Sequence, residues 1–217
     1  MKITIISHAA GTPKIGPNLR TYYLATYLKK LNHSVNVIGA SNFHKYHTTP
    51  LEYYKKLDIV IEGVKYTWLK TPKYNGRFMQ VVNQLTFSIL LPFKIKIIKK
   101  HNPDIIIFSS PPPIGLLSSV LITKLLGKKM IIDIRDLWPE IIQDLGGLVK
   151  HNPYVLFTKL VVKFAYKNSD GIVSVKKGDI NFIKKNYPAK GIFKFIPNGY
   201  DVNPVSYTHL RAHETVS

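Results

Sequence analysis

The segment from Ile132 to Glu140 carries two acids, an arginine and a tryptophan directly after an apolar run. The run from Met130 to Ile134 predicts a buried β-strand, at whose end Asp133, Arg135 and Asp136 lie. Open α/β sheets place their ligands at the carboxyl ends of their strands. This segment is therefore the first candidate for a functional site.

Some residues of this segment also have ordinary structural explanations. Asp136 precedes a helical pattern and is a suitable helix cap. Trp138 offers a flat face to a sugar ring, but its apolar neighbours suit core packing equally well. The two nearby carboxylates would also suit a glycoside hydrolase, which needs an acid and a base or nucleophile. The alternation of strands and helices argues against that class.

The loop after the first predicted strand is a second candidate, and it contains Gly11, Pro13, Gly16, Asn18 and Arg20. Glycines allow the backbone to approach a ligand closely, and the next helix would begin with free amides and a positive dipole end. The dinucleotide fingerprint of three glycines at fixed offsets is absent. A plain turn in which Asn18 caps the helix is the alternative.

Two further segments follow predicted strands. Ser109-Ser110-Pro111-Pro112-Pro113 predicts an extended loop with small hydroxyl groups at a strand end, or else a stiff connector without function. Asn198-Gly199 is a turn dipeptide near the end of the chain.

The pattern along the chain predicts strands that alternate with helices. We expect strands at Lys2 to Ser7, Ser34 to Gly39, Asp58 to Ile61, Val64 to Leu69, Asp104 to Ser109, Met130 to Ile134, Gly171 to Val175 and Phe193 to Ile196. We expect helices at Leu19 to Leu31, Phe78 to Lys100, Ile114 to Leu126, Val155 to Tyr166 and Lys177 to Lys185, and a loop at Ser41 to Lys56. The fold class is α/β, a Rossmann-like parallel sheet with helices on both faces.

The order and spacing of these segments resemble the N-terminal half of a family 4 glycosyltransferase of the GT-B fold. Within that family the sequence resembles bacterial enzymes of surface-polysaccharide synthesis (capsule and O-antigen), of the fucosamine-transferase type. The resemblance runs from Met1 to about Pro204 and stops before the second Rossmann-like domain, in which such enzymes bind the nucleotide sugar. We therefore expect residues 1–204 to be the acceptor-side domain of a truncated chain that is inactive alone.

The resemblance implies a retaining transfer of a sugar from a nucleotide-sugar donor, a UDP-sugar, to a saccharide on a polyprenyl diphosphate, without metal or cofactor. It implies catalytic roles for Arg135, Asp136 and Glu140, with the charge of Arg135 neutralising the departing diphosphate. It places Gly11, Pro13, Gly16, Asn18 and Arg20 between acceptor and donor phosphates. It gives an acceptor pocket of Ser109, Ser110, Pro111, Asp133 and Trp138, and an interdomain cleft at Asn198 and Gly199.

The sequence departs from the family pattern at two places. Many relatives have histidine before aspartate where Arg135-Asp136 stands, although in the branch that this sequence resembles arginine is the expected residue. Relatives also have paired glycines where Ile15-Gly16-Pro17-Asn18 stands. Two other functions remain as alternatives. A nucleotide-sugar epimerase or dehydrogenase would need the full glycine fingerprint and a Tyr-x-x-x-Lys motif, which we do not find. A noncatalytic module that binds an acceptor or a membrane needs neither.

The chain is strongly basic, with 31 lysines and arginines against 12 acids among 217 residues. An anionic membrane surface and an AT-rich genome explain this charge equally well, whereas the lack of a nucleic-acid-binding motif argues against nucleic acid. Val81 to Lys100 is apolar and then lysine-rich, which suits either an interfacial helix or a buried helix with a basic end. We expect a cytoplasmic protein, peripheral on the inner face of the membrane.

The chain has no cysteine, so disulfides and thiolate metal sites are excluded, and it begins without a signal-peptide pattern. The last segment, Val205 to Ser217, breaks every preceding pattern and resembles one reading frame of a sequencing-library adapter. We expect it to be a non-native tail, in which the spacing of His209 and His213 has no metal-binding meaning.

Overall fold

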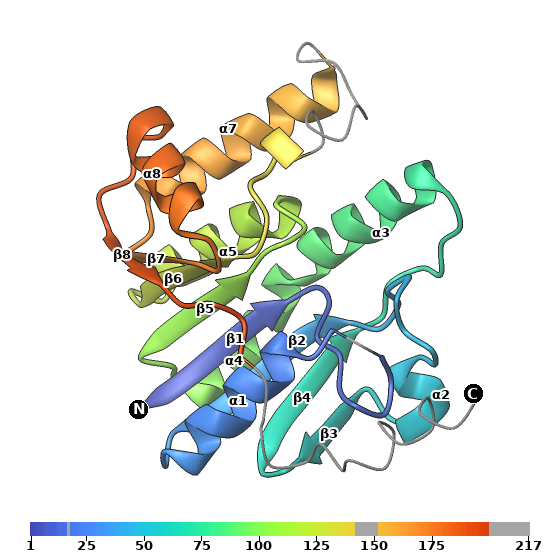
Figure 1. The fold of residues 1–217 in the computed structure, drawn as a ribbon. Helices are drawn as coiled ribbons and strands as arrows, with labels where there is room; N and C mark the ends of the chain where they lie inside the picture. Colours follow the sequence, from blue (N-terminus) through green and yellow to red (C-terminus); the bar gives the residue numbers. More distant parts are fainter. Residues whose placement is uncertain (17, 142–151, 200–217) are drawn as a thin grey trace, which may run out of the picture.

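An eight-stranded sheet forms the centre of the fold, in the order β3-β4-β2-β1-β5-β6-β7-β8 (Figure 1). The computed structural model describes residues 1–16, 18–141 and 152–199, so the predicted tail lies outside the described residues. The strands are β1 (Lys2–Ser7), β2 (Ser34–Ala40), β3 (Asp58–Ile61), β4 (Val64–Leu69), β5 (Ile105–Ser109), β6 (Lys129–Ile134), β7 (Gly171–Ser174) and β8 (Ile192–Phe195). β3 and β4 pair antiparallel, whereas the other neighbouring strands pair parallel.

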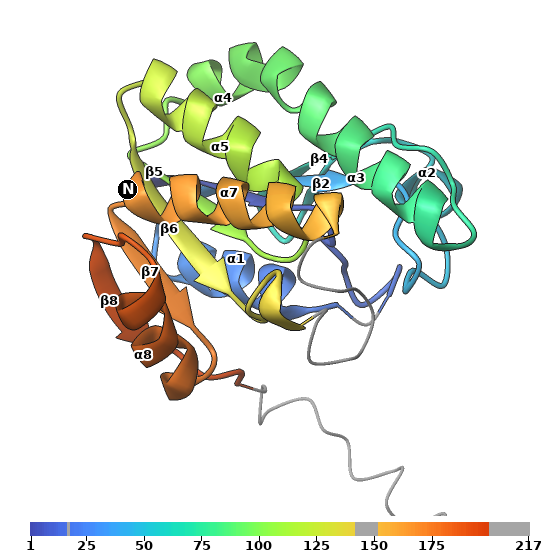
Figure 2. The same cartoon turned by 90° about the horizontal axis from the view of Figure 1, so that it is seen from above.

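Helices cover both faces of this sheet. They are α1 (Arg20–Lys30), α2 (Pro50–Tyr54), α3 (Arg77–Leu90), η1 (Pro92–Lys94), α4 (Ile95–His101), α5 (Ile114–Leu125), α7 (Pro153–Lys167) and α8 (Lys177–Asn186). Figure 2 shows α3, α4, α5 and α7 together on one side of the sheet and α1 on the other. The predicted α/β class, a mostly parallel sheet between helices, is confirmed.

The strand sequences explain why both faces are covered. In β1, Ile3 and Ile5 are buried on the side of α1, whereas Ile6 joins the core beneath α3, α5 and α7. Side chains alternate between the two faces of a strand, so a strand that is apolar at nearly every position needs a partner layer on each side. The two hydrophobic cores of the domain therefore follow from the isoleucine-rich strands.

Two predicted elements differ from the structure. The segment predicted as a loop from Ser41 to Lys56 contains α2, whose N-cap Thr49 forms a capping box with Glu52. That prediction was wrong because the Thr-x-x-Glu signal was missed. The single helix predicted from Phe78 to Lys100 is divided into α3, η1 and α4, because Pro92 cannot continue the hydrogen-bond ladder of the preceding turn.

The register of the sheet aligns the polar ends of three strands. Ser7 at the end of β1 pairs with Ser109 of β5, which in turn pairs with Asp133 of β6. The order of strands reverses at β1, since β2 lies on one side of it and β5 on the other. Ligands of open α/β sheets bind at the carboxyl edge beside such a reversal.

Candidate functional site

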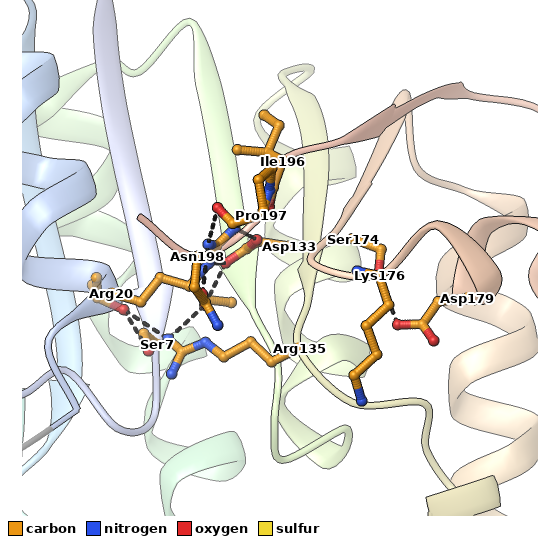
Figure 3. Close-up of polar contacts among 12 residues, drawn as sticks. Ser7, Arg20, Asp133, Arg135, Ser174, Lys176, Asp179, Ile196, Pro197 and Asn198 are labelled. Atoms are coloured by element: carbon orange, nitrogen blue, oxygen red, sulfur yellow. Dashed lines mark hydrogen bonds and ion pairs between the residues drawn. The ribbon is translucent and has the colours of Figure 1, made fainter. Parts of the chain in front are cut away.

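Asp133 is the centre of a polar network at this edge of the sheet (Figure 3). Arg20, the first residue of α1, donates to both carboxylate oxygens, from Nη2 at 2.7 Å and from Nε at 3.1 Å. The Ser109 hydroxyl donates to Oδ2 at 2.9 Å. The aspartate side chain is only 5% exposed and the arginine side chain 17%. A paired arrangement of this kind fixes both side chains and the strand end.

Arg135 lies beside this pair and is held by neutral oxygens. Its guanidinium donates to the side-chain oxygen of Asn18, to the Thr21 hydroxyl at 3.1 Å and to the Ser109 hydroxyl at 2.9 Å. Its Nε is buried and has no partner among the described residues. Burial lowers the pKa of Arg135, the charge of Asp133 raises it, and Arg20 lowers it again. Its charge is thus not neutralised by a direct ion pair.

The predicted role of Asn18 as a helix cap is wrong. The N-cap of α1 is Leu19, and no side chain accepts a hydrogen bond from the first turn. The Asn18 oxygen instead accepts from Arg135, so the first loop positions the arginine from the sixth strand.

The charges around the strand ends leave an excess of positive charge. Arg20 and Arg135 face one buried carboxylate, Asp133. Asp136 is more exposed, at 38% of its side chain, and its nearest cation is Lys176 at 3.8 Å. Buried charges that lack a counter-charge are costly unless a ligand supplies one. The edge is therefore suited to an anionic group.

Arg20 also reaches the end of the described chain. Its Nη1 donates to the Asn198 side chain at 2.9 Å and to the Pro197 carbonyl at 3.4 Å, and Nη2 donates to the Ile196 carbonyl at 3.4 Å. The predicted cleft residue Asn198 thus joins the network, whereas its neighbour Gly199 is exposed. Figure 3 shows this segment passing over Asp133.

A cavity of about 410 Å³ lies next to Arg135. Its lining combines aromatic rings with uncharged polar groups and a few charges: His8, Asn18, Phe43, His44, Lys45, Tyr74, Gln80, Gln84, Pro111, Pro112, Arg135, Asp136 and Trp138. This mixture of flat apolar faces and a few polar groups is typical of small-ligand sites. Of the residues predicted for an acceptor pocket, Pro111 and Trp138 line the cavity.

The other residues predicted for the acceptor pocket connect the ends of β5 and β6 by hydrogen bonds. Ser109 and Asp133 are taken up in the arginine network, and the Ser110 amide donates to the Asp133 carbonyl at 2.9 Å. Counted as whole residues these three are buried, with exposed fractions of 1% for Ser109, 4% for Ser110 and 3% for Asp133. They hold the strand ends together and do not line the cavity.

Four other predicted residues lie apart from the cavity. Glu140 accepts a hydrogen bond from the Tyr187 hydroxyl at 2.6 Å. Burial, and after it this hydrogen bond, raises the pKa of that tyrosine. Pro13 is exposed. Gly16 and Gly11 are packing positions, since an added Cβ would lie 2.9 Å from the Lys45 carbonyl oxygen and 3.0 Å from that of Asn18, respectively.

The sequence did not single out the far wall of the cavity. His8, Phe43, Tyr74 and Gln84 come from a strand end, two loops and helix α3. His8 had a usable signal, because it directly follows the predicted first strand. The described residues contain no group of three or more histidines, cysteines or acids that could hold a metal ion.

Comparison with known families shows which family the chain belongs to. Residues 16–204 match the profile of Glycosyltransferase Family 4. The chain belongs to glycosyltransferase family 4. No curated protein matches the sequence.

Solved glycosyltransferases share the fold of this family 4 domain. Sucrose-phosphate synthase from Thermosynechococcus elongatus is 12% identical with a TM-score of 0.69, over 97% of this chain and 52% of the other. UGT89C1 from Arabidopsis thaliana, complexed with UDP, is 13% identical with a TM-score of 0.59, over 92% of this chain and 49% of the other. Alr3699/HepE from Anabaena, in complex with UDP and glucose, is 13% identical with a TM-score of 0.51, over 96% and 49%.

At these identities the likeness shows the fold alone, which is that of a GT-B N-terminal domain. The chain spans about half the length of these three proteins.

Proposed function

We propose that this domain is the acceptor-side half of a retaining glycosyltransferase that uses a UDP-sugar and a lipid-linked saccharide in surface-polysaccharide synthesis. The observation that carries the proposal is the pair of arginines, Arg20 and Arg135, over the single buried carboxylate of Asp133. Departure of a nucleoside diphosphate develops negative charge, and a fixed cation at that place lowers the barrier. UDP in two of the similar structures supports a nucleotide-sugar donor.

In this proposal a donor-binding domain follows Pro204, and no metal is needed. Arg135 is held by Asn18, Thr21 and Ser109, so its charge is placed before the donor arrives. A charge that is already oriented costs no reorganisation at the moment of reaction. Asp136 and Trp138 then contribute to the acceptor side, where they line the cavity.

The test is transfer of labelled sugar from a panel of UDP-sugars to lipid extracted from bacterial membranes, with the longest protein that the gene encodes. Replacement of Arg135 by glutamine is expected to lower the rate about 100- to 1000-fold, as for removal of one transition-state donor. Lys190→Gln changes an exposed cation that lies outside the cavity and between α8 and β8, and it is the matched control. Transfer that is equal in the two variants would refute the role of Arg135, and absence of transfer with every donor would refute the function.

We propose further that the helical layer of α3, η1, α4, α5 and α7 rests on an anionic membrane at the inner face of the cell. Large apolar side chains are exposed on this layer: Phe78, Leu85, Ile89, Phe93, Leu121, Leu125, Leu156, Phe157 and Leu160. These helices contain eight lysines and no acid. An exposed apolar patch with a basic rim is typical of a surface that enters the headgroup region.

The segment Arg77–His101 is the one described helical stretch that is long and apolar enough to cross a membrane. In the fold, however, Phe87, Leu91 and Ile98 of this segment are fully buried against the sheet. A segment with one side in the protein core and the other exposed fits a helix that lies on the surface of the bilayer.

Sedimentation with phosphatidylglycerol vesicles tests this surface. Phe93, which is 76% exposed, becomes serine in the test variant, and Leu31 on the opposite layer, which is 67% exposed, becomes serine in the control. Loss of one buried phenylalanine is expected to weaken vesicle binding about tenfold. Equal binding of both variants, or equal binding to uncharged phosphatidylcholine vesicles, would contradict the proposed surface.

A further inference from the structure

Arg20 is a cation at the unfavourable end of a helix. It is the first residue of α1, whose first turn contains no acid and has no side-chain cap. The N-terminus of a helix carries partial positive charge, so a cation there is locally destabilising. Positions that break a local rule in this way are expected where a function requires it. The reason for an arginine here must therefore lie in its contacts with distant segments.

The guanidinium of Arg20 makes five hydrogen bonds, as many as it has N–H groups. Two of them join Nε and Nη2 to the carboxylate of Asp133, at 3.1 and 2.7 Å. The other three join Nη1 and Nη2 to the carbonyls of Pro197 and Ile196, both at 3.4 Å, and to the Asn198 side chain at 2.9 Å. The donors are thus divided between one strand end and the segment after β8 (Figure 3).

Arg135 differs from Arg20 in this respect. Arg135 makes three side-chain hydrogen bonds to the described residues, and it lines the cavity. Arg20 does not line the cavity, and its hydrogen bonds equal its N–H groups in number. We expect no N–H of Arg20 to remain for a ligand, so the two arginines have different roles.

Residues 196–199 depend on Arg20 for their position. All four are exposed, so no buried side chain fixes this segment. The Ile196 amide donates to the Ser174 carbonyl at 3.0 Å, whereas three hydrogen bonds reach the segment from Arg20. In the sheet, β8 is the edge strand, and β7 and then β6 follow it inward. The chain after β8 therefore turns back toward the end of β6, where Arg20 contacts Asp133.

We propose that Arg20 fixes the direction in which the chain leaves this domain, by joining residues 196–198 to the end of β6. It is a positioning residue, because it contacts the segment and not the cavity. A lysine would not replace it, since one ammonium group lacks the planar fork that reaches a carboxylate and the segment together. In the enzyme of the proposed function this segment leads to the donor-binding domain. Arg20 then sets the position of that domain relative to Arg135, and this second step rests on the proposed function.

NMR relaxation of the backbone amides of the 217-residue chain tests the first step. In the unchanged protein the order parameter of the Asn198 amide is expected to be about 0.85, the value of a rigid backbone. Arg20→Lys and Asn198→Ala are each expected to lower it at position 198 to below about 0.6. Asn198 is exposed, and its replacement leaves the pair of Arg20 and Asp133 in place. This variant decides the test if Arg20→Lys does not fold.

Two controls accompany this measurement. The Ile196 amide donates to Ser174 and is expected to stay rigid in every variant. Lys177→Gln removes a cation that lies 5.4 Å from the ring centroid of Phe195, directly before the segment. It is expected to leave the order parameter at position 198 unchanged. Sodium diphosphate, added to the unchanged protein, is expected to leave the Arg20 Nε signal unchanged, because that N–H donates to Asp133.

The second step predicts a kinetic signature in the longest protein that the gene encodes. Asn198→Ala is expected to lower kcat about 10- to 100-fold, because a small displacement of one domain misaligns the reacting groups. The KM values for the UDP-sugar and the lipid are expected to stay unchanged, since Asn198 does not line the cavity. The urea midpoint of this variant is measured as well, so that a loss of folded protein is not mistaken for a loss of kcat.

Three results would overturn the inference in whole or in part. If both variants keep the order parameter of the unchanged protein at position 198, Arg20 does not fix the segment. If diphosphate shifts the Arg20 Nε signal and lowers that order parameter, Arg20 is an anion-binding residue. If the order parameter falls and kcat is unchanged, the second step is wrong while the first stands. The NMR measurement needs no transfer, so it decides the first step even where the transfer assay refutes the proposed function.

Discussion

Replacement of Asp133 by asparagine removes the only buried carboxylate that faces Arg20 and Arg135 among the described residues. In the native domain Asp133 accepts two hydrogen bonds from Arg20 and one from Ser109. The pair is 17% and 5% exposed, so solvent replaces little of the lost interaction. Breaking a buried pair by removal of one partner costs about 3–5 kcal/mol, because the other charge stays buried. Because Asp133→Asn leaves both Arg20 and Arg135 without a buried carboxylate, we expect the loss in free energy of unfolding to lie in the upper part of that range.

Equilibrium unfolding in urea at pH 7 measures this loss directly. Lys73→Met is the matched control, since Lys73 and Glu52 form an ion pair of similar length, 2.8 Å, with side chains 75% and 50% exposed. Such an exposed pair contributes about 0–1 kcal/mol. If Asp133→Asn costs no more than Lys73→Met, the edge of the sheet does not depend on the buried carboxylate, and the charge argument for the site is wrong.

Three further changes have expected outcomes. Thr49→Ala removes the N-cap oxygen of α2 and is expected to cost about 1 kcal/mol in urea unfolding, whereas no loss would mean that α2 adds no stability. Gly39→Ala places a Cβ 2.6 Å from that of Ala10 and is expected to lower the free energy of unfolding in urea by about 1–3 kcal/mol. An unchanged urea midpoint would contradict this close packing. Burial lowers the pKa of His8 from 6.5 to about 4, so the unfolded chain binds a proton at this residue at higher pH than the folded chain does. The free energy of unfolding is therefore expected to fall by about 2 kcal/mol as pH falls from 6.5 to 5. If a His8→Phe protein loses the same stability over this pH range, His8 is not the group responsible.

The sheet could be predicted from the sequence because its strands are buried on both faces. Continuous apolar runs such as Ile105–Ser109 and Lys129–Ile134 can be recognised without knowledge of their neighbours. The polar residues at the ends of such strands must then meet at one edge of a parallel sheet. For this reason the pattern could place Asp133 and Ser109 each at a strand end, whereas only the family resemblance assigned both to one acceptor pocket.

The partners of each side chain could not be predicted in this way. Asn18 suits a helix cap in sequence, but Arg135 lies within reach from a strand 117 residues away and takes its oxygen. Glu140 is close to Asp136 in the sequence, yet it meets Tyr187. Local spacing determines which face of an element a residue occupies, whereas its hydrogen-bond partner depends on how distant elements pack.

The end of β6 connects two parts of the site, because side chains two residues apart there contact different neighbours. Asp133 contacts Arg20, and Arg20 contacts Asn198 in the segment that follows β8. Arg135, two residues later, lines the cavity. The Ser109 hydroxyl joins the two, since it donates to Asp133 and accepts from Arg135. This one hydroxyl therefore connects the arginine that contacts Asn198 with the arginine at the cavity.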